Sequence, residues 1–256
     1  MKNEEKRPKK FSFISEQLIE AELNRELTEK MKQKLIDLLF KCKNAFATDK
    51  KPLGSIIGHQ VDIITNVEYP YPPLLRRTAY PAIPRAREPL EVEIKELMDL
   101  GVLSKVGHNE QVEVTKPVII NWNNGKSRMV GDVRSISTYT IPDRDPIPRI
   151  HETLTQLSEA KLVTAMDNIK GFEQNVLTEN SRKLLSIIVH CGIYEHLRIP
   201  FGMKNPPPHY QRMMNTIFPE KLSEGWLIIY IDYIIVFSET WENNPTRLEI
   251  FLQKIV

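Results

Sequence analysis

The sequence has few cysteines, no long apolar segment and almost no excess of charge of either sign. Its two cysteines, Cys42 and Cys191, form neither a CxxC pair nor a disulfide framework, which favours a reducing, intracellular setting, cytoplasmic or nuclear. The apolar run at 227–237 contains Asp232 and is well short of the ~18 residues that span a bilayer, so no membrane partner is expected. Thirty-five Lys and Arg balance 33 Asp and Glu, so bulk charge predicts neither attraction to nucleic acid nor avoidance of it.

The N-terminus is charged rather than apolar. Residues 1–14 are predicted to be a disordered basic tail, and nothing in them resembles the apolar segment of a secretory signal. The stretch "KRPKK" is either a nuclear localisation signal or a solvated tail. With 41% hydrophobic residues, the 256-residue chain can bury a substantial core in one large domain or two smaller ones.

Helical and proline-rich patterns occupy the first hundred residues. Apolar spacings of three and four predict an amphipathic helix over 15–46, which is either core or a partner-binding surface, and 15–60 is taken as a helical segment with its linker. A short strand is expected at 59–67. The prolines that follow favour an extended path, and Pro89 is expected to begin a second helix that stops at Gly101.

Beyond Gly101 the pattern becomes that of strands separated by turns. We expect three hairpins, at 112–134, 186–199 and 226–239, a buried strand at 160–167, and helices beginning near Pro148, over 206–218 and near Arg247. This interleaving of strands and helices predicts an α+β fold with a mostly antiparallel sheet.

Two aspartates lie where apolar strands end. Asp167 follows "KLVTAM", and Asp232 lies at the turn of "WLIIYIDYIIVFSE". If the two strands are neighbours, the carboxylates repel each other unless a cation or a proton lies between them, and hard oxygen ligands of this kind suit Mg²⁺. The alternative is that each aspartate merely ends a strand.

Four segments match known family motifs in order. "NNGKSRMVGDVRSISTYTIPDRDPIPRI" is similar to DGSWRMVVDYRALNxxTIPDRYPLPRI, "TAMDNIKGFEQ" to a strand whose Asp is followed by GFHQ or GYHQ, "IPFGMKNPPPHYQRMMN" to PFGLKNAPxxFQxxMN, and "YIDYIIVFSET" to a YxDD hairpin. Together they resemble the reverse transcriptases of gypsy-type LTR retrotransposons, from about residue 35 to residue 256.

The resemblance implies a fold, an activity and its partners. It implies a right-hand polymerase at 61–256, with fingers, an antiparallel palm sheet flanked by helices, and the first part of a truncated thumb at 245–256. The activity would be template-directed dNTP polymerisation by two-metal phosphoryl transfer with Mg²⁺. The implied partners are an RNA or DNA template-primer duplex, dNTP and other Pol-derived chains.

Roles carry over to the positions that match the motifs. Asp167 and Asp232 match the catalytic, metal-binding carboxylates. The dNTP-binding matches are the triphosphate-contacting arginine, the aromatic residue beside the sugar and three residues of the pocket and template side: Arg128, Phe172, Phe201, Gly202 and Gln211. Without the motifs, Arg128 is a surface arginine on a hairpin, and Phe172 is an ordinary core aromatic.

Several motif positions depart from the family. Tyr233 stands where the second adjacent aspartate would be and makes this a degenerate catalytic position. Glu173 replaces a histidine, and Val133, Ser137 and Pro206 are further changes within motifs. We therefore expect a catalytically degraded domain with little or no activity alone, all the more because the sequence given includes no complete thumb and no RNase H domain.

Two other functions remain open. One is an active reverse transcriptase subunit that borrows a thumb from other chains, for which incorporation would require a partner. The other is a non-catalytic nucleic-acid-binding or scaffold protein derived from a retrotransposon, for which salt-dependent binding without incorporation is expected.

Overall fold

The computed structural model describes residues 26–48, 53–81, 84–107, 110, 112–123 and 126–256, and omits the side chains at 85 and 120–128. The chain divides into two compact units. Unit 1 comprises residues 1–54, 148–169 and 215–256, and unit 2 comprises residues 55–147 and 170–214. The predicted disordered tail at 1–14 lies outside the described residues.

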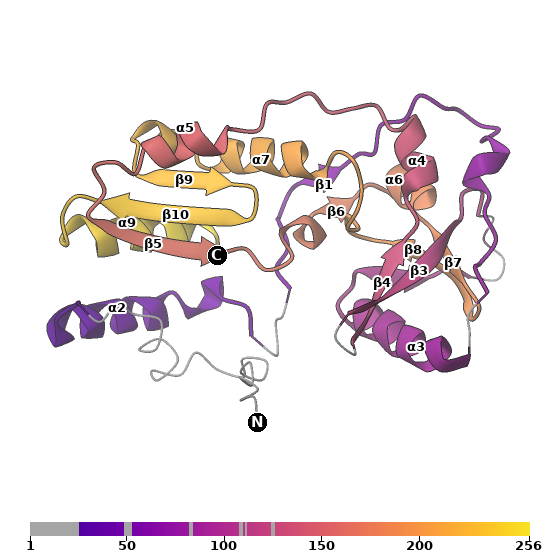
Figure 1. Cartoon of the computed structure of the whole chain (residues 1–256), viewed down its shortest axis with the longest axis horizontal. Helices are drawn as coiled ribbons and strands as arrows, with labels where there is room; N and C mark the ends of the chain where they lie inside the picture. The colour runs from indigo at the N-terminus through magenta and orange to yellow at the C-terminus, as the bar shows by residue number, and fades with distance from the viewer. Residues whose placement is uncertain (1–25, 49–52, 82–83, 108–109, 111, 124–125) are drawn as a thin grey trace. The chain divides into compact units, whose positions relative to one another are not determined.

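Unit 1 is built on a three-stranded antiparallel sheet, shown with its helices in Figure 1. The strand order is β5 (Leu162–Asp167), β10 (Tyr233–Ser238) and β9 (Leu227–Tyr230). The helices of this unit are α2 (Glu29–Lys41), α5 (Ile150–Thr155), α8 (Pro219–Ser223) and α9 (Asn243–Lys254), with the short 3-10 turn η1 (Lys43–Ala45). The β9–β10 hairpin and the helix after Pro148 confirm the expectations, whereas α9 begins before Arg247.

Helix α9 covers one face of this sheet. The hydroxyl of Thr164 on β5 donates a 3.2 Å hydrogen bond to the amide oxygen of Asn244, and Leu248 is fully buried. The other face of β5 is open: Val163 is 53% exposed, and Ala165 and Asp167 on the same side of the strand are exposed as well. The prediction of a buried strand at 160–167 was therefore wrong: the strand exists, but it alternates between half-buried and exposed residues.

Helix α2 is shorter than the amphipathic pattern predicted. Residues 26–28 are not helical, because Thr28 caps the helix: its side chain accepts a 3.4 Å hydrogen bond from the N–H of Met31. The part of the predicted helix at 15–25 lies outside the described residues. Lys41 pairs with Glu249 of α9 at 2.5 Å, and this places α2 against core-forming elements of unit 1.

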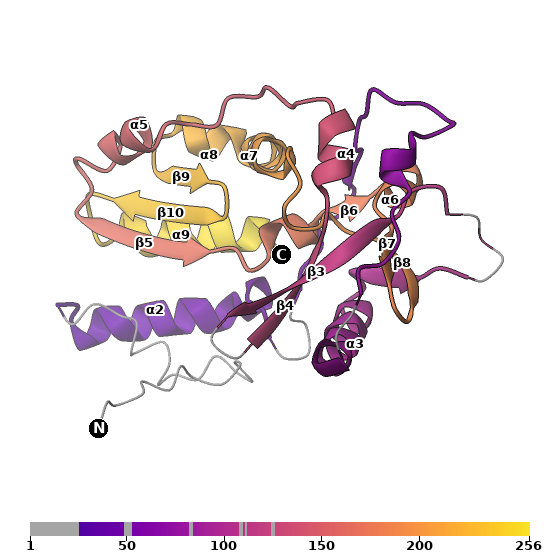
Figure 2. The ribbon, with the colours of Figure 1, turned by 45° about the vertical axis from the view of Figure 1, so that its right-hand side comes forward.

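Unit 2 is built on a five-stranded sheet, seen most openly in Figure 2. Its order is β2 (Leu103–Lys105), β8 (Gly192–His196), β7 (Ile187–Val189), β3 (Lys116–Asn123) and β4 (Lys126–Gly131). The β3–β7 pair is parallel and the other three pairs are antiparallel. A separate short parallel pair joins β1 (Gln60–Val61) and β6 (Val176–Leu177). Both hairpins predicted here are confirmed, but only two residues of 59–67 form a strand.

The helices and 3-10 turns that begin in unit 2 are α3 (Pro84–Asp99), α4 (Arg134–Tyr139), α6 (Glu179–Leu184), α7 (Pro206–Ile217), η2 (Pro73–Leu75) and η3 (Gly171–Gln174). Helix α3 starts at Pro84, so the expectation that Pro89 begins it was wrong. Pro89 lies inside α3, where its missing N–H removes one backbone hydrogen bond. Gly101 has a φ of +64°, as expected for a glycine that ends a helix.

Two buried clusters hold unit 2 together. One gathers Leu75, Ile136, Leu177 and Leu185, all fully buried, beneath the proline-rich segment. The other lies between α3 and the sheet and includes Leu90, Ile94, Leu103, Val118, Ile187, Val189 and Tyr194. The α+β class and the mainly antiparallel pairing are as predicted. No helix in the described part of the chain combines the length and the apolar character that crossing a membrane requires.

Candidate active site

Two carboxylates meet at one end of the unit 1 sheet. Asp167 is the last residue of β5, and Asp232 lies in the turn between β9 and β10. The strand register places Asp167 opposite Tyr233, and the backbone N–H of Asn168 donates a 2.8 Å hydrogen bond to the carbonyl of Asp232. The structure thus brings the two predicted aspartates onto neighbouring strands.

The turn that carries Asp232 has a strained backbone. Tyr230 pairs with Tyr233, so Ile231 and Asp232 form a two-residue hairpin turn. Ile231 has a φ of +53°, in the left-handed region that a β-branched residue seldom enters. Such a conformation costs on the order of 1–3 kcal/mol and persists only where the surrounding structure enforces it. The hairpin therefore fixes the position of Asp232 at an energetic cost.

The environment of Asp232 favours a nearby cation. Its Oδ1 atom is buried and has no hydrogen-bond partner among the described residues. Burial raises the pKa of the Asp232 carboxyl, and the negative charge of Asp167 raises it further. A desolvated carboxylate beside a second carboxylate is stable as an anion only when a positive charge approaches it. Two hard oxygen donors of this kind suit Mg²⁺.

Tyr233 presents a phenol on the same face as Asp167. Residues directly opposite on antiparallel strands project to one side of a sheet, and the Tyr233–Asp167 pair is such a pair. Tyr233 is 62% exposed, so its ring stands beside the carboxylates in solvent rather than in the core. A phenol supplies no negative charge at neutral pH and a weaker donor atom for Mg²⁺ than a carboxylate.

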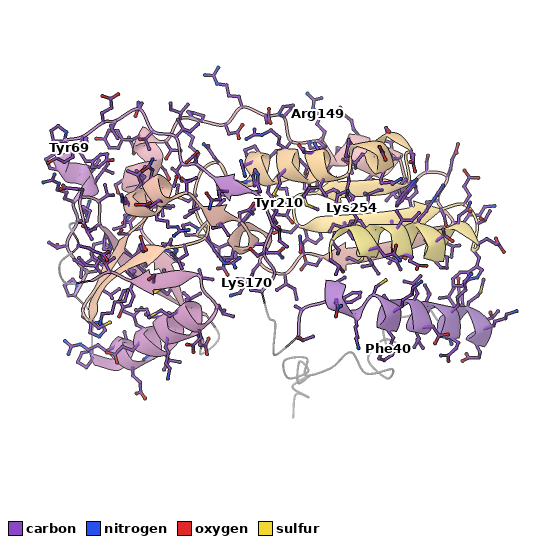
Figure 3. The ribbon with its side chains drawn as sticks, turned by 180° about the vertical axis from the view of Figure 1, so that it is seen from behind. Phe40, Tyr69, Arg149, Lys170, Tyr210 and Lys254 are labelled. Carbon is purple, nitrogen blue, oxygen red and sulfur yellow. The ribbon has the colours of Figure 1, made fainter. Side chains whose placement is uncertain are left out.

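The predicted nucleotide-pocket residues belong to unit 2. Phe172 of η3 makes edge-to-face contacts with Tyr210, at a ring-centroid distance of 5.8 Å, and with Phe201, at 6.3 Å. Phe172 is half-buried and also packs against the first apolar cluster. The structure therefore brings Phe172 and Phe201 together, with Tyr210 of α7 completing the aromatic group; Figure 3 labels Tyr210.

Gly202 and Gln211 lie near this aromatic group in the sequence. Gly202 has a φ of +85°, and a side chain there would come within 3.6 Å of Val133. Gln211 is 2% exposed, on the face of α7 that packs inward. Arg128 lies on β4 opposite Asn121, and its side chain is outside the described part of the structure.

Glu173, one of the departures from the family pattern, forms an ion pair. Its carboxylate lies 3.1 Å from the amino group of Lys170, and its side chain is 8% exposed. Lys170 adopts a left-handed φ of 52° at the start of η3. Tyr210 stands at the aromatic position of the PFGLKNAPxxFQxxMN motif, so the motif could have indicated it. The only sequence signal for the Lys170–Glu173 pair is the spacing of three residues, which is compatible with an ion pair within one turn.

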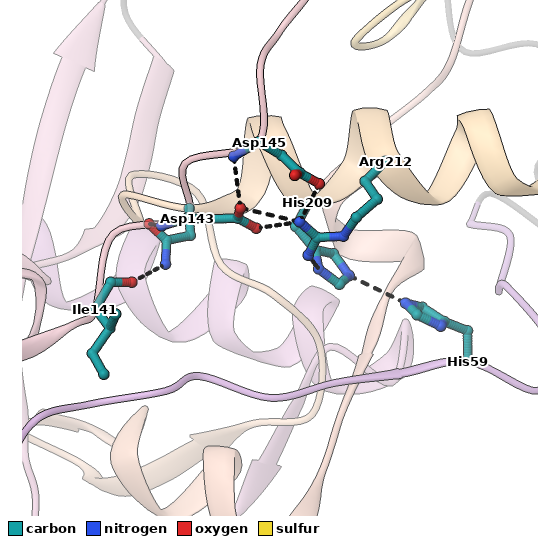
Figure 4. Close-up of polar contacts among 7 residues, drawn as sticks. His59, Ile141, Asp143, Asp145, His209 and Arg212 are labelled. Carbon is teal, nitrogen blue, oxygen red and sulfur yellow. Dashed lines mark hydrogen bonds and ion pairs between the residues drawn. The ribbon is translucent and has the colours of Figure 1, made fainter.

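A charged network ties the "TIPDRDPIPRI" loop to α7 (Figure 4). The guanidinium of Arg212 lies 2.9 Å from the carboxylate of Asp143 and 2.5 Å from that of Asp145. It also lies 3.2 Å from Nδ1 of His209, which must act as the acceptor, because a guanidinium only donates. His209 then donates through Nε2 to Nε2 of His59, 3.1 Å away, and burial lowers the pKa of His209.

The network shapes a cavity of about 290 Å³ in unit 2. Asn205 completes its wall: its side chain accepts a hydrogen bond from the N–H of Asp143 at 3.1 Å and donates one to the carbonyl of Ile141 at 2.6 Å. These contacts hold the loop against the beginning of α7, the helix that carries Gln211. The loop motif and the α7 motif, read separately in the sequence, are thus physically connected.

Comparison with known proteins gives a consistent result. The family described as reverse transcriptase (RNA-dependent DNA polymerase) matches residues 114–256, more than half of the chain. The Pol polyprotein of transposon opus from Drosophila melanogaster is 33% identical over 77% of this chain and 19% of its own length. That of transposon gypsy, from the same organism, is 28% identical over 89% of this chain and 22% of its own. The chain thus spans about a fifth of these relatives.

Solved structures agree on the fold. A foamy viral protease-reverse transcriptase in complex with double-stranded DNA superposes with a TM-score of 0.79, 20% identity, and coverage of 94% of this chain and 40% of that chain. The same viral enzyme with an RNA/DNA hybrid gives a TM-score of 0.79, 19% identity, and coverage of 97% and 33%. The fold is that of polymerase palm and fingers. With the family match, this shows that the chain belongs to the reverse transcriptases, as a domain of the gypsy-type retrotransposon Pol polyproteins.

Proposed function

We propose that this chain extends a primer on a nucleic-acid template by Mg²⁺-dependent nucleotidyl transfer, at a rate reduced by Tyr233. The observation that carries the proposal is the Asp167–Asp232 pair, with one buried, unpartnered oxygen on Asp232. The family match supports the reaction class. The nucleic-acid complexes of the foamy viral enzyme support a template-primer duplex as the partner.

In this proposal Asp167 and Asp232 hold the metal. Bound Mg²⁺ neutralises the charge that develops on the transferred phosphate and lowers the pKa of the attacking hydroxyl. Asp232 contributes a desolvated carboxylate on a rigid turn, so little reorganisation is needed when a cation arrives. Asp167 is exposed and can meet both the cation and an approaching substrate.

The proposed nucleotide site lies in unit 2. Phe172, packed by Tyr210 and Phe201, offers a fixed aromatic surface for a sugar. Gln211 and Gly202 are proposed to border the same pocket, and Arg128 to contact the triphosphate, where a guanidinium fork suits phosphate oxygens. These roles rest on the motif positions and on the packing of the aromatic group.

Tyr233 is proposed to slow the reaction without abolishing it. It leaves both observed carboxylates in place but removes one negative charge from the turn and adds an exposed ring beside Asp167. Because catalysis here depends on electrostatic stabilisation, a loss of about 1.4 to 2.7 kcal/mol lowers the rate by roughly 10- to 100-fold.

The test is primer extension on a primed RNA template with Mg²⁺ and four dNTPs. We expect slow incorporation by the unaltered chain and incorporation roughly 10- to 100-fold faster by Tyr233→Asp. Tyr230→Asp is the matched control, because Tyr230 is the aromatic residue opposite Tyr233 on β9 and is not next to Asp232 in the sequence. The control should show no gain.

Two results would contradict the proposal. If neither the unaltered chain nor Tyr233→Asp incorporates nucleotide while both bind the primed template, the chain is not a polymerase. If Tyr230→Asp gains as much as Tyr233→Asp, the gain comes from added charge in general and not from the position beside Asp232.

The second candidate function is nucleic-acid binding without catalysis. It is favoured by exposed side chains on β5 and β10: Tyr233, which lies opposite Asp167, is 62% exposed, and Val163 of β5 is 53% exposed. An exposed aromatic ring can stack on a base. Fluorescence anisotropy of a primed RNA at low and at physiological salt, measured with the extension assay, separates the two functions. Binding that weakens with salt, without incorporation by either chain, identifies the second.

A further inference from the structure

We propose that Glu91, His190 and Cys191 form a binding site for a zinc-class transition metal ion in unit 2, separate from the carboxylates of unit 1. One ligand atom from each residue, a carboxylate oxygen, an imidazole nitrogen and a sulfur, lies within 4.8 Å of the other two. Neither the family resemblance nor the proposed polymerase activity uses these three residues.

The fold brings the three ligands together from distant parts of the sequence. Glu91 lies on α3, whereas His190 and Cys191 form the turn between β7 and β8. Leu90 and Val189, the neighbours of Glu91 and His190, are both buried in the second apolar cluster, and the half-buried Cys191 packs against it. The helix and the turn are therefore fixed to one core, so the ligand atoms stay close without a metal.

The ligand set selects the type of metal. Thiolate and imidazole favour Zn²⁺ and related ions, whereas Mg²⁺ prefers an all-oxygen site. Three protein ligands leave the fourth tetrahedral position for water or for a group from another molecule. The chain would thus hold two kinds of cation site, a hard one at Asp167 and Asp232 and a softer one at the β7–β8 turn.

The short distance between His190 and Glu91 supports metal binding by this pair. His190 Nε2 lies 2.8 Å from the carboxylate of Glu91, so a single proton lies between the two atoms that would bind the ion. The side chain of His190 is 20% exposed and that of Glu91 is 56% exposed, so an ion can reach them from solution. Replacement of the shared proton by a metal ion requires only small side-chain movements.

Tyr194 contacts the thiol of Cys191. Its hydroxyl lies 3.7 Å from Cys191 Sγ, and it can donate to the sulfur when this is a thiolate. Donors of this kind orient metal ligands, and their loss weakens binding by roughly 10- to 100-fold.

The experiment uses Co²⁺ as a spectroscopic probe. Reduced, tag-free full chain is titrated with Co²⁺ in excess Mg²⁺, which occupies the carboxylate pair. We expect one Co²⁺ per chain with a thiolate-to-cobalt charge-transfer band that Zn²⁺ displaces. Cys191→Ser should lose the band, and His190→Gln and Glu91→Gln should bind at least about 100-fold more weakly, because a lost ligand costs no less than a lost outer partner.

Controls separate this site from other thiols and carboxylates. Cys42→Ser removes the other cysteine, which is buried in unit 1, and should leave the band unchanged. Tyr194→Phe should keep the band but weaken binding by about 10-fold. Circular dichroism of each variant verifies that it is folded, and His190→Gln retains the thiol if Cys191→Ser does not fold.

The proposal is overturned by any of three results. The unaltered chain shows no thiolate band, Cys42→Ser loses the band instead of Cys191→Ser, or His190→Gln and Glu91→Gln bind Co²⁺ as tightly as the unaltered chain. Primer extension plays no part in these measurements, so failure of the metal site and failure of the proposed polymerase activity are distinguishable.

Discussion

Each unit holds an ionisable side chain away from water, Asp232 in unit 1 and Lys116 in unit 2, but the two side chains differ in their access to ions from solution. In unit 1, Asp232 is partly buried beside an exposed second carboxylate, Asp167, at the end of a sheet. In unit 2, Lys116 on β3 is 1% exposed, and its amino group donates to the carbonyls of Leu184 and Ser186, the latter at 3.4 Å. Burial alone lowers the pKa of Lys116 to about 7.

The difference shows what a buried charge requires. Lys116 is enclosed, so no ion from solution can neutralise it, and it becomes stable by losing its proton. His196 nearby behaves in the same way: burial, then the charge of Lys116, lowers its pKa to about 3. Asp232 lies at the end of its sheet beside a like charge, where a divalent cation can bind. Whether an ion from solution can reach a partly buried charge, more than the type of residue, decides if that charge becomes a binding site.

The largest effect is expected at Asp232. Asp232→Asn keeps the shape but removes the charge, so incorporation by the proposed polymerase should fall about 1000-fold or more. Because the repulsion with Asp167 also disappears, the unfolding temperature without Mg²⁺ should not fall. Single-turnover primer extension and thermal unfolding measure the two effects, with Glu239→Gln, an exposed acid just beyond β10, as the control. A parallel loss of activity and stability would contradict this account.

The next largest effect is expected at Lys116. Between pH 7 and its ordinary pKa near 10.5, the unfolded chain binds a proton that the folded chain does not, so stability rises with pH across this range. Lys116→Met should remove this rise and increase the free energy of unfolding by about 3 kcal/mol at pH 6. Urea unfolding at pH 6 and pH 9 measures both.

Lys183→Met is the matched control for Lys116→Met. Lys183 forms an exposed pair with Glu179 on α6, and its side chain is 65% exposed. Its replacement should change the free energy of unfolding by less than about 1 kcal/mol at either pH. If Lys116→Met has the same pH dependence as the unaltered chain, Lys116 is not neutral in the folded state above pH 7.

The smallest effect on stability is expected for the charged network that joins the "TIPDRDPIPRI" loop to α7. Arg212→Ala should cost about 1 kcal/mol of unfolding free energy, because the Arg212 side chain is 46% exposed although that of Asp143 is largely covered. Arg149→Ala, which removes an 85% exposed side chain 3.9 Å from Glu152, should cost less than about 0.5 kcal/mol. Thermal unfolding at low and high salt compares them. Equal losses would mean that Arg212 does not hold the loop in place.

The sequence predicted the hairpins well, because they follow from local patterns: alternating apolar residues interrupted by "NNGK" or by Asp232 indicate strands with turns. The helix over 206–218 was predicted for the same kind of reason, since proline is tolerated in its first turn. The adjacency of the two aspartates did not follow from local pattern, because it depends on which strands are neighbours, and only the family resemblance favoured it.

Other features could not be read from local pattern. Whether β5 is buried depends on which elements cover its two faces, which no property of "KLVTAM" encodes. Helix α3 begins at Pro84 because its packing against the sheet outweighs the unfavourable Pro89. The Glu91–His190–Cys191 group and the environment of Lys116 arise from contacts between residues about 70 to 100 positions apart, which only the tertiary structure reveals.

The most direct test of the central claim is a Mn²⁺ titration, followed by electron paramagnetic resonance, of the unaltered chain, Asp167→Asn and Asp232→Asn. Mn²⁺ replaces Mg²⁺ at hard oxygen sites and reports its own bound fraction. We predict a site that both variants lose, that Mg²⁺ displaces, that strengthens as pH rises through the raised pKa of Asp232, and that Cys191→Ser leaves unchanged. Equal Mn²⁺ binding by the unaltered chain and both Asn variants would contradict the assignment of the carboxylate pair as a divalent-cation site.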